Sequence, residues 1–356
     1  MSKPMSALPD EPIRADTVAL ADLDTTQPNA AYMRTGIARL QSGLALGDPH
    51  DLAAYLTLAR RLYAAGRFDL PLGRLFEGHI DALQIIARYA DTDTATALHA
   101  KARAGACFGV WNAPLAGEPL AFDGERLAGG KAFASGAGLL THALVSADVA
   151  DSDSKQLLVV DLDATPPAID RDWWQVLGMQ RSETHLVRWR DAPLGARDAV
   201  IGTPGDYERE PWLSAGALRF VAVQAGGIAG LFDGVRDHLV ARGRAGDPHQ
   251  AARLGRLYDV AASAAGVCRD TAAQLFDTPA ASHPARVASA RSRVLDAGEQ
   301  ALHLTQQSVG LSAFFETDPL CAQMADLMVY LRQPAPDAQR VKVGTAAADG
   351  TIEPSL

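Results

Sequence analysis

The chain has few cysteines, and none of them are paired in sequence. Cys107, Cys268 and Cys321 are far apart and form no Cys-x-x-Cys motif, which excludes a disulfide framework and a cysteine-rich zinc site. The chain also lacks an apolar run of about 18 residues that would span a membrane, and its first thirty residues hold no secretory hydrophobic segment. We therefore expect a cytoplasmic protein with reduced thiols and no membrane span.

Positive charge is also scarce. Lys and Arg total 33 against 42 Asp and Glu, a net charge of −9, and the pI is near 5.5. Nucleic acids and anionic membrane surfaces both reward clustered Lys and Arg, so neither is expected as the main partner. The content of 48% apolar and 21% charged residues is that of an ordinary globular protein.

A chain of 356 residues is long enough for two or three domains, each with its own core. Changes in apolar spacing predict an α+β multidomain protein in five segments. These are a flexible arm over residues 1–30, an N-terminal helical domain over 31–104, a central antiparallel β-barrel or sandwich over 105–200, a C-terminal bundle of four-helix type over 201–337, and a disordered tail over 338–356.

Apolar residues at three- to four-residue spacing place the helices. In the N-terminal part, Asp48-Pro49 is expected to begin a helix that Gly66 ends, and a further helix is expected over residues 75–89. The bundle helices are predicted over residues 211–242, 249–277, 284–308 and 319–332. Between them, short β-rich runs are predicted around residues 107–111, 131–133, 143–145, 157–161 and 186–189.

Motifs of several other protein classes are incomplete. Gly136-Ala-Gly138 is followed by Thr141, where a dinucleotide-binding loop needs its third glycine. His79 and His249 each have one acidic neighbour two positions earlier but no third group, so we interpret them as hydrogen-bonded or solvated histidines and predict no metal site. No Gly-x-Ser-x-Gly elbow or Walker lysine motif is present.

Two segments in the strand-rich part carry the most information. Residues 129–138 read GGKAFASGAG and residues 173–180 read WWQVLGMQ; their glycines and small polar side chains let the backbone approach a flat ligand. The helix–sheet–helix order with these segments resembles the acyl-CoA dehydrogenase flavoproteins. That family carries a Lys-x-Trp-Ile-Thr/Ser segment against the flavin ring, and the matching positions here include Lys131, Phe133 and Ser135.

The resemblance covers about residues 75–337 and implies FAD as the cofactor. It implies that Phe133 and Ser135 contact the flavin, with the Ser135 hydroxyl near flavin N5. It also implies that Trp111 and Asn112 stand where the family has a Thr-Glu or equivalent pair facing the flavin.

The C-terminal bundle carries a second set of matches. Residues 307–319 resemble the family's Gln-x-x-Gly-Gly-x-Gly-Phe/Tyr segment, which reaches the adenosine end of the flavin on a neighbouring subunit. Gln307 and Gly310 agree with it, whereas Leu311 and Ala313 replace glycines. In the loop after the first long bundle helix, Arg244 resembles the arginine that clamps the pyrophosphate, a role that suits a guanidinium fork.

The catalytic base does not carry over. Family dehydrogenases remove the acyl α-proton with a glutamate, and the two positions where the resemblance places that residue hold Pro334 and Arg219. No catalytic residue is therefore assigned. Glu208 and Glu210, in the loop before the first long bundle helix, are the remaining candidates.

The resemblance implies an FAD-dependent oxidoreductase that acts on an acyl-CoA or a related small substrate, with an electron-transfer flavoprotein as a possible acceptor. Two alternatives stay open. One is a relative of the flavin monooxygenase type, which uses flavin without a glutamate base. The other is a degenerate homologue that has lost the flavin and serves as a partner or scaffold subunit. A helix rich in small residues around 226–230 and the long bundle predict a homo-oligomer, either a dimer or a tetramer.

Overall fold

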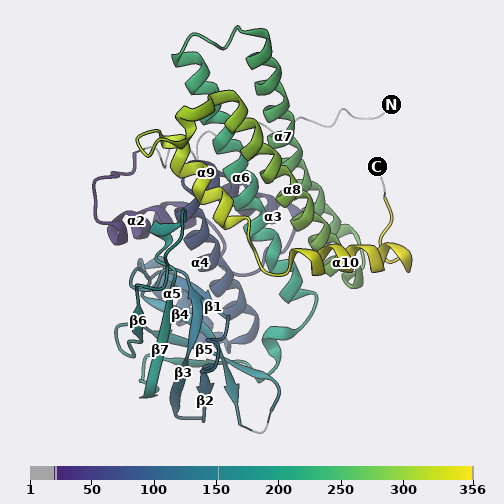
Figure 1. Cartoon of the computed structure of the whole chain (residues 1–356). Coiled ribbons are helices and arrows are strands. Elements are labelled where there is room, and N and C mark those ends of the chain that lie inside the picture. The colour runs from purple at the N-terminus through teal and green to yellow at the C-terminus, as the bar shows by residue number, and fades with distance from the viewer. Residues whose placement is uncertain (1–19, 21, 151, 355–356) are drawn as a thin grey trace.

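The computed structural model describes residues 20, 22–150 and 152–354. In these residues, most of the helices form one end of the molecule, and a β-sheet forms the other together with the helices over residues 70–103 (Figure 1). The longer helices are α2 (Asn29–Gln41), α3 (Leu52–Phe68), α4 (Leu70–Tyr89), α5 (Thr92–Arg103), α6 (Trp212–Ala241), α7 (Pro248–Asp277), α8 (His283–Val309), α9 (Pro319–Tyr330) and α10 (Pro336–Ala348). Short 3-10 turns lie at Gln180–Ser182, Asp206–Glu208, Ala280–Ser282 and Gly310–Phe314.

The strands form one mixed sheet. They are β1 (Phe108–Trp111), β2 (Ala121–Phe122), β3 (Arg126–Ala134), β4 (His142–Val149), β5 (Lys155–Asp161), β6 (Ala168–Asp170), β7 (His185–Pro193) and β8 (Ala199–Ile201). The order is β6-β7-β3-β2-β4-β5-β8, with β1 beside β4. Most pairs are antiparallel, as predicted, but β1 and β2 run parallel to β4, an arrangement that the long connections from these strands to β4 permit.

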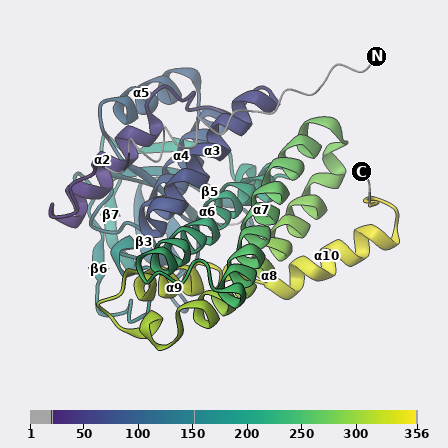
Figure 2. The same cartoon turned by 90° about the horizontal axis from the view of Figure 1, so that it is seen from above.

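Helix α6 is the centre of the helical part (Figure 2). Its small residues let α3 approach so closely that a Cβ built on Gly226 would lie 2.1 Å from the Tyr63 carbonyl oxygen. In the same contact, a Cβ on Gly66 would lie 2.1 Å from the Val223 carbonyl oxygen. Gly66 therefore lies inside α3 as a packing residue and does not end the helix, contrary to the prediction.

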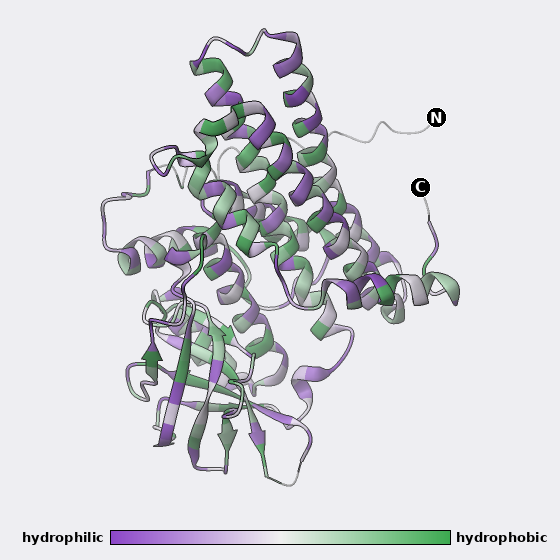
Figure 3. Ribbon diagram, viewed as in Figure 1, coloured by the Kyte–Doolittle hydropathy of each residue, from purple (hydrophilic) through white to green (hydrophobic). Residues whose placement is uncertain are grey.

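The prediction that the chain has no apolar stretch long enough to span a membrane does not hold for helix α6. By length and composition it passes as a candidate span, the only one in the described part of the chain, but 67% of its apolar window is buried inside the protein. It packs against α3, α7 and α8. Its apolar character therefore serves the core of the fold, and Figure 3 shows the mixed hydropathy of the helices around it.

The predicted bundle helices are confirmed almost residue for residue by α6, α7, α8 and α9. Aspartates begin two of them: Asp247 accepts from the Gln250 amide at 3.1 Å, and Asp318 accepts from the Leu320 amide at 3.0 Å. Such side chains satisfy amide groups that the first helical turn leaves free. The same rule places the start of α3 at Asp51 rather than at Asp48.

Two predicted flexible regions need correction. The tail over 338–356 is not disordered throughout, because α10 spans Pro336–Ala348 and packs on α8. Its alanine-rich sequence favours helix. Most of the predicted arm, 1–30, lies outside the described residues, but Leu20 and Leu23 are buried in the core and α2 already begins at Asn29.

Candidate functional site

The end of β3 presents an aromatic surface, which we name the aromatic rim and define as Phe133, Trp173 and Trp174. Phe133 has a φ of +53°, a conformation that is costly for a bulky residue and that clusters at ligand sites. Its side chain is 56% exposed and meets the Trp173 ring edge-on at 4.8 Å between centroids. The two tryptophans stack at 5.9 Å. The rim is therefore an accessible apolar face of the kind that covers a planar ligand.

Ser135 lies beside the rim and is held by its neighbours. Its hydroxyl oxygen accepts from the Thr184 hydroxyl at 3.0 Å, and its carbonyl accepts from the Trp111 indole N–H at 2.9 Å. Ser135 is 8% exposed, and among the described residues no acceptor takes its hydroxyl proton, so a ligand that reaches this small opening would find a free donor.

Trp111 does not face a ligand. Its side chain is 1% exposed and packs near Trp189, so the prediction that it contacts a cofactor is wrong. The aromatic ring belongs to the core, and its N–H positions the Ser135 backbone. Asn112, the next residue, is exposed and accepts from the Ser146 hydroxyl through its side-chain oxygen.

Lys131 is buried beneath this region, with 1% exposure. Its ammonium donates to the Asn112 carbonyl at 3.1 Å and to the Ser146 hydroxyl at 3.0 Å. Burial lowers the pKa of Lys131 to about 8, an effect that the nearby Lys155 reinforces. The lysine of the quoted segment therefore acts within the protein, where it connects β3 to the end of β1 and to β4.

The loop between β6 and β7 fastens the rim to the bundle. A Cβ on Gly178 would lie 2.1 Å from the Ala325 carbonyl oxygen of α9, so only glycine fits there. The next residue, Met179, donates its amide to the Asp326 carboxylate. Burial raises the pKa of Asp326 to about 6. Gly178 and Met179 thus place the loop that carries Trp173 directly under α9.

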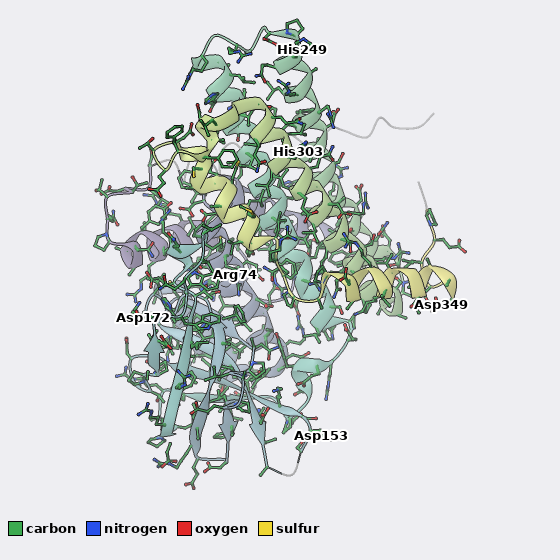
Figure 4. The ribbon with its side chains drawn as sticks, in the orientation of Figure 1. Arg74, Asp153, Asp172, His249, His303 and Asp349 are labelled. Carbon is green, nitrogen blue, oxygen red and sulfur yellow. The ribbon has the colours of Figure 1, made fainter. Side chains whose placement is uncertain are left out.

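The other predicted ligand residues lie elsewhere. Arg244 is in the turn between α6 and α7 and pairs with Asp247 at 3.2 Å. Figure 4 shows His249, two residues beyond Asp247, at the end of the bundle far from Asp172, which neighbours the rim. Gln307 is exposed near the end of α8 and contacts His303, and Gly310 has open space around it. One chain therefore does not bring Arg244 to Ser135.

Both positions where the resemblance places a base line one cavity. It has a volume of about 380 Å³ and lies between α4, the start of α6, α8 and the α9–α10 connection. Arg219 and Pro334 are in its wall, and so is Glu210. The Arg219 guanidinium donates to Asp81 and Gln84 of α4. The cavity is thus framed by a buried ion pair, and neither position supplies a free carboxylate.

The two acidic candidates have different surroundings. Glu210 accepts from the Ser214 hydroxyl at 2.6 Å and from its amide at 3.1 Å, which makes it a capping residue of α6. Glu208 is exposed and is not among the residues that line this cavity. Of the pair, only Glu210 is placed to meet a ligand in the cavity.

Helix α4 carries a stripe of polar residues that was not predicted from the sequence. Glu77, Asp81, Gln84 and Arg88 recur three or four residues apart, so they lie along one face of the helix. Glu77 is buried and pairs with Arg74 at 2.5 Å; burial raises its pKa, an effect that Arg74 opposes. This polar period within an apolar helix was visible in the sequence and identifies one wall of the cavity.

The interpretation of His79 as a hydrogen-bonded core residue is confirmed. Its Nδ1 accepts from the Phe108 amide at 3.1 Å, and its Nε2 lies 2.9 Å from the Gln41 side-chain oxygen. Burial lowers the pKa of His79 to about 3, so the ring is neutral with its proton on Nε2. Neither nitrogen is free to ligate a metal.

Solved structures of two kinds resemble the chain. FMN-bound TdsC from Paenibacillus sp. A11-2, a dibenzothiophene monooxygenase, matches with a TM-score of 0.75 and 18% identity over 95% of this chain and 98% of that one. Butyryl-CoA dehydrogenase from Megasphaera elsdenii matches at 0.76 and 14% over 98% of this chain and 100% of that one. Glutaryl-CoA dehydrogenase from Mycobacterium smegmatis matches at 0.78 and 13%, over 96% of each chain.

No protein-family model matches the sequence, and the comparison with curated proteins finds no match. The structural matches cover nearly the whole chain, further than the 75–337 over which the sequence motifs extend. Their identities are low, so they establish architecture and not chemistry. The chain has the acyl-CoA dehydrogenase fold, which acyl-CoA dehydrogenases and flavin monooxygenases share.

Proposed function

We propose that the protein is a flavin-dependent oxidoreductase that acts on a small substrate in the cavity between α4 and α6. The observation that carries this proposal is the aromatic rim. In this fold, an exposed phenylalanine at positive φ stands beside a serine with a free hydroxyl proton. The rim offers an apolar face, and Ser135 beside it offers a hydrogen-bond donor. The flavin ring is planar and carries hydrogen-bond acceptors, so it suits both.

The described residues fit a flavin divided between two copies of the chain. Phe133, Ser135 and Asn112 would hold the ring, whereas Arg244 and the turn at Gly310 would hold the diphosphate and adenosine of FAD from a second copy. No atom lies within 4 Å of the position that a Cβ on Gly310 would take, which leaves room for the adenosine. Arg244 is exposed and pairs with one carboxylate, that of Asp247. We prefer FAD to FMN because only FAD has a diphosphate and an adenosine for Arg244 and the turn at Gly310 to bind.

The same proposal includes finer points of architecture. We infer that residues 31–104, 105–200 and 201–337 act as three domains, that the sheet curls into a small barrel, and that the protein is a cytoplasmic homo-oligomer. Tyr258 and Phe276 are exposed on α7, and a second copy would cover such apolar side chains. A monomer would separate Arg244 from Ser135, so the FAD site also requires the oligomer.

A bound flavin would supply either hydride acceptance from an acyl thioester or, once reduced, activation of oxygen. Hydride acceptance needs a carboxylate at the α-carbon, and the two expected positions hold Arg219 and Pro334. This absence favours the monooxygenase-type alternative, which would take electrons from a reductase rather than pass them to an electron-transfer flavoprotein. Glu210 remains the candidate base if the substrate is an acyl-CoA.

Mixing the flavin-loaded protein with butyryl-CoA under anaerobic conditions tests this choice. Slow or absent bleaching of the flavin, together with oxygen-dependent turnover when a flavin reductase is added, supports the monooxygenase type. Rapid bleaching by butyryl-CoA supports the dehydrogenase. A colourless protein that takes up neither FAD nor FMN would leave the scaffold alternative and overturn the proposal.

A further inference from the structure

The acidic residues that line the cavity have polar partners within the protein, whereas two of its basic residues have no carboxylate partner among the described residues. Its carboxylates are already engaged: Glu77 pairs with Arg74, Asp81 pairs with Arg219, and Glu210 accepts two hydrogen bonds from Ser214. Among the described lining carboxylates, Glu210 alone has no cationic partner, and its side chain is exposed to solvent, which screens its charge.

Two lining cations have no such partner. Arg291 of α8 is partly buried, and the one hydrogen bond that its guanidinium makes to a described residue runs to the Pro334 carbonyl at 2.9 Å. Its other contact is with the Phe220 ring at 5.2 Å. Lys342 of α10 is exposed at the cavity. Within residues 20, 22–150 and 152–354, neither lies within ion-pair distance of a carboxylate.

Leaving the Arg291 guanidinium partly buried without an anionic partner costs free energy. A guanidinium has five N–H donors in a planar fork, and burial lowers the pKa of Arg291 because no nearby carboxylate offsets the lost hydration. Charged groups that lose hydration on burial are stabilised by a partner, and the Arg291 guanidinium has one carbonyl acceptor. An anion in the cavity would supply the missing partner.

The opposite wall also presents unused polar atoms. The Arg219 Nε and the Tyr89 hydroxyl are both buried without a hydrogen-bond partner among the described residues, and both residues line the cavity. Buried donors without acceptors are rare in folded proteins. A ligand with acceptor oxygens would satisfy these donors once the wall side chains turn toward it, which a purely apolar ligand would not do.

The remaining wall is apolar, with Ile85, Leu213, Ala217 and Val287 among its residues. A cavity of about 380 Å³ suits a small molecule. We propose that the substrate carries a carboxylate, bound between Arg291 and the Arg219–Tyr89 wall with its apolar part against these side chains. The identification as a substrate rests on the proposed oxidoreductase function, whereas the carboxylate site itself does not require flavin.

Calorimetric titration of the full-length protein with two matched pairs tests the site: phenylacetate against phenylacetamide, and octanoate against octanamide. At least one acid is expected to bind more tightly than its neutral amide. Arg291→Gln should weaken that acid roughly tenfold or more, the usual loss for a charge-assisted hydrogen bond, and leave the amide unchanged. Arg269→Gln, an exposed arginine of α7 paired with Asp270, is the matched control and should change neither.

A second variant separates loss of the carboxylate site from misfolding, because Arg291 also donates to the Pro334 carbonyl in the α9–α10 connection. Lys342→Gln removes an exposed charge at the same cavity and should weaken the acid severalfold. Equal binding of acid and amide, no saturable binding of either acid, or an acid preference that survives both substitutions overturns the proposal. Because the titration needs no cofactor, an acid preference in a protein that never takes up flavin would defeat the proposed function and leave the carboxylate site standing.

Discussion

Replacing Asp326 by asparagine tests how the loop that carries Trp173 is fastened to the bundle. Asp326 accepts the Met179 amide, and burial raises the pKa of its carboxyl to about 6. An asparagine oxygen keeps the acceptor without the charge. Because the protein buries a carboxylate that is ionised at neutral pH, Asp326→Asn is expected to stabilise the fold there.

The sign and size follow from linkage. A carboxyl whose folded pKa is raised contributes stability that is fully present below its unfolded pKa, near 4, and is lost as pH rises through 6. A shift of about two pKa units corresponds to roughly 3 kcal/mol. The side chain is only partly buried, so we expect a gain of about 1–3 kcal/mol at pH 8 and roughly half of it at pH 5.

Urea unfolding of the wild type and of Asp326→Asn at these two pH values measures the effect. Asp259→Asn, an exposed position on α7, is the control and should change the free energy of unfolding little at either pH. A destabilised Asp326→Asn at pH 8, or a gain that does not depend on pH, would show that ionisation of the buried Asp326 carboxyl does not destabilise the fold.

Other consequences concern the cofactor and the assembly. Arg244→Ala should weaken FAD retention, because losing a charge-assisted clamp typically costs about 1.5–3 kcal/mol; unchanged occupancy would remove Arg244 from the site. Ser135→Ala should weaken flavin binding by about 1 kcal/mol, measured by fluorescence titration, with Ser152→Ala in an exposed turn as the control. If butyryl-CoA does bleach the flavin, Glu210→Gln should slow it roughly a hundred- to ten-thousandfold, whereas Glu208→Gln should not. Light scattering should give a multiple of 37.6 kDa; a monomer at micromolar concentration contradicts the divided FAD site.

The helices were the most predictable part of the fold. Apolar spacing, aspartate caps and prolines are local signals, and they placed α6 to α9 to within about two residues. The predicted β-rich runs match β1, β3, β4, β5 and β7, whereas the short strands β2, β6 and β8 were not predicted. The parallel neighbours of β4 depend on long-range pairing that no local signal carries. Gly66 shows the same limit, since a glycine that ends a helix and one that admits a neighbour look alike in sequence.

The candidate site was only partly predictable. Phe133 and Ser135 were singled out by one short motif, and they stay a prediction for the flavin site. The same family resemblance also suggested Trp111 through a different segment, and the fold turns that side chain into the core. The cavity was missed because its walls come from α4, α6 and α8, which are far apart in sequence. Arg291 gave no signal, because an arginine on a polar helix face looks solvated until tertiary packing buries it.

Binding of flavin at the aromatic rim is the basis of the proposed function. The most direct measurement is the visible spectrum of the protein after incubation with FAD and removal of free cofactor, alongside the Phe133→Ala variant. We expect bands of bound oxidised flavin that Phe133→Ala weakens, because the exposed ring at positive φ would cover the flavin face. A colourless wild-type protein, or full flavin retention by Phe133→Ala, would contradict flavin binding at the rim.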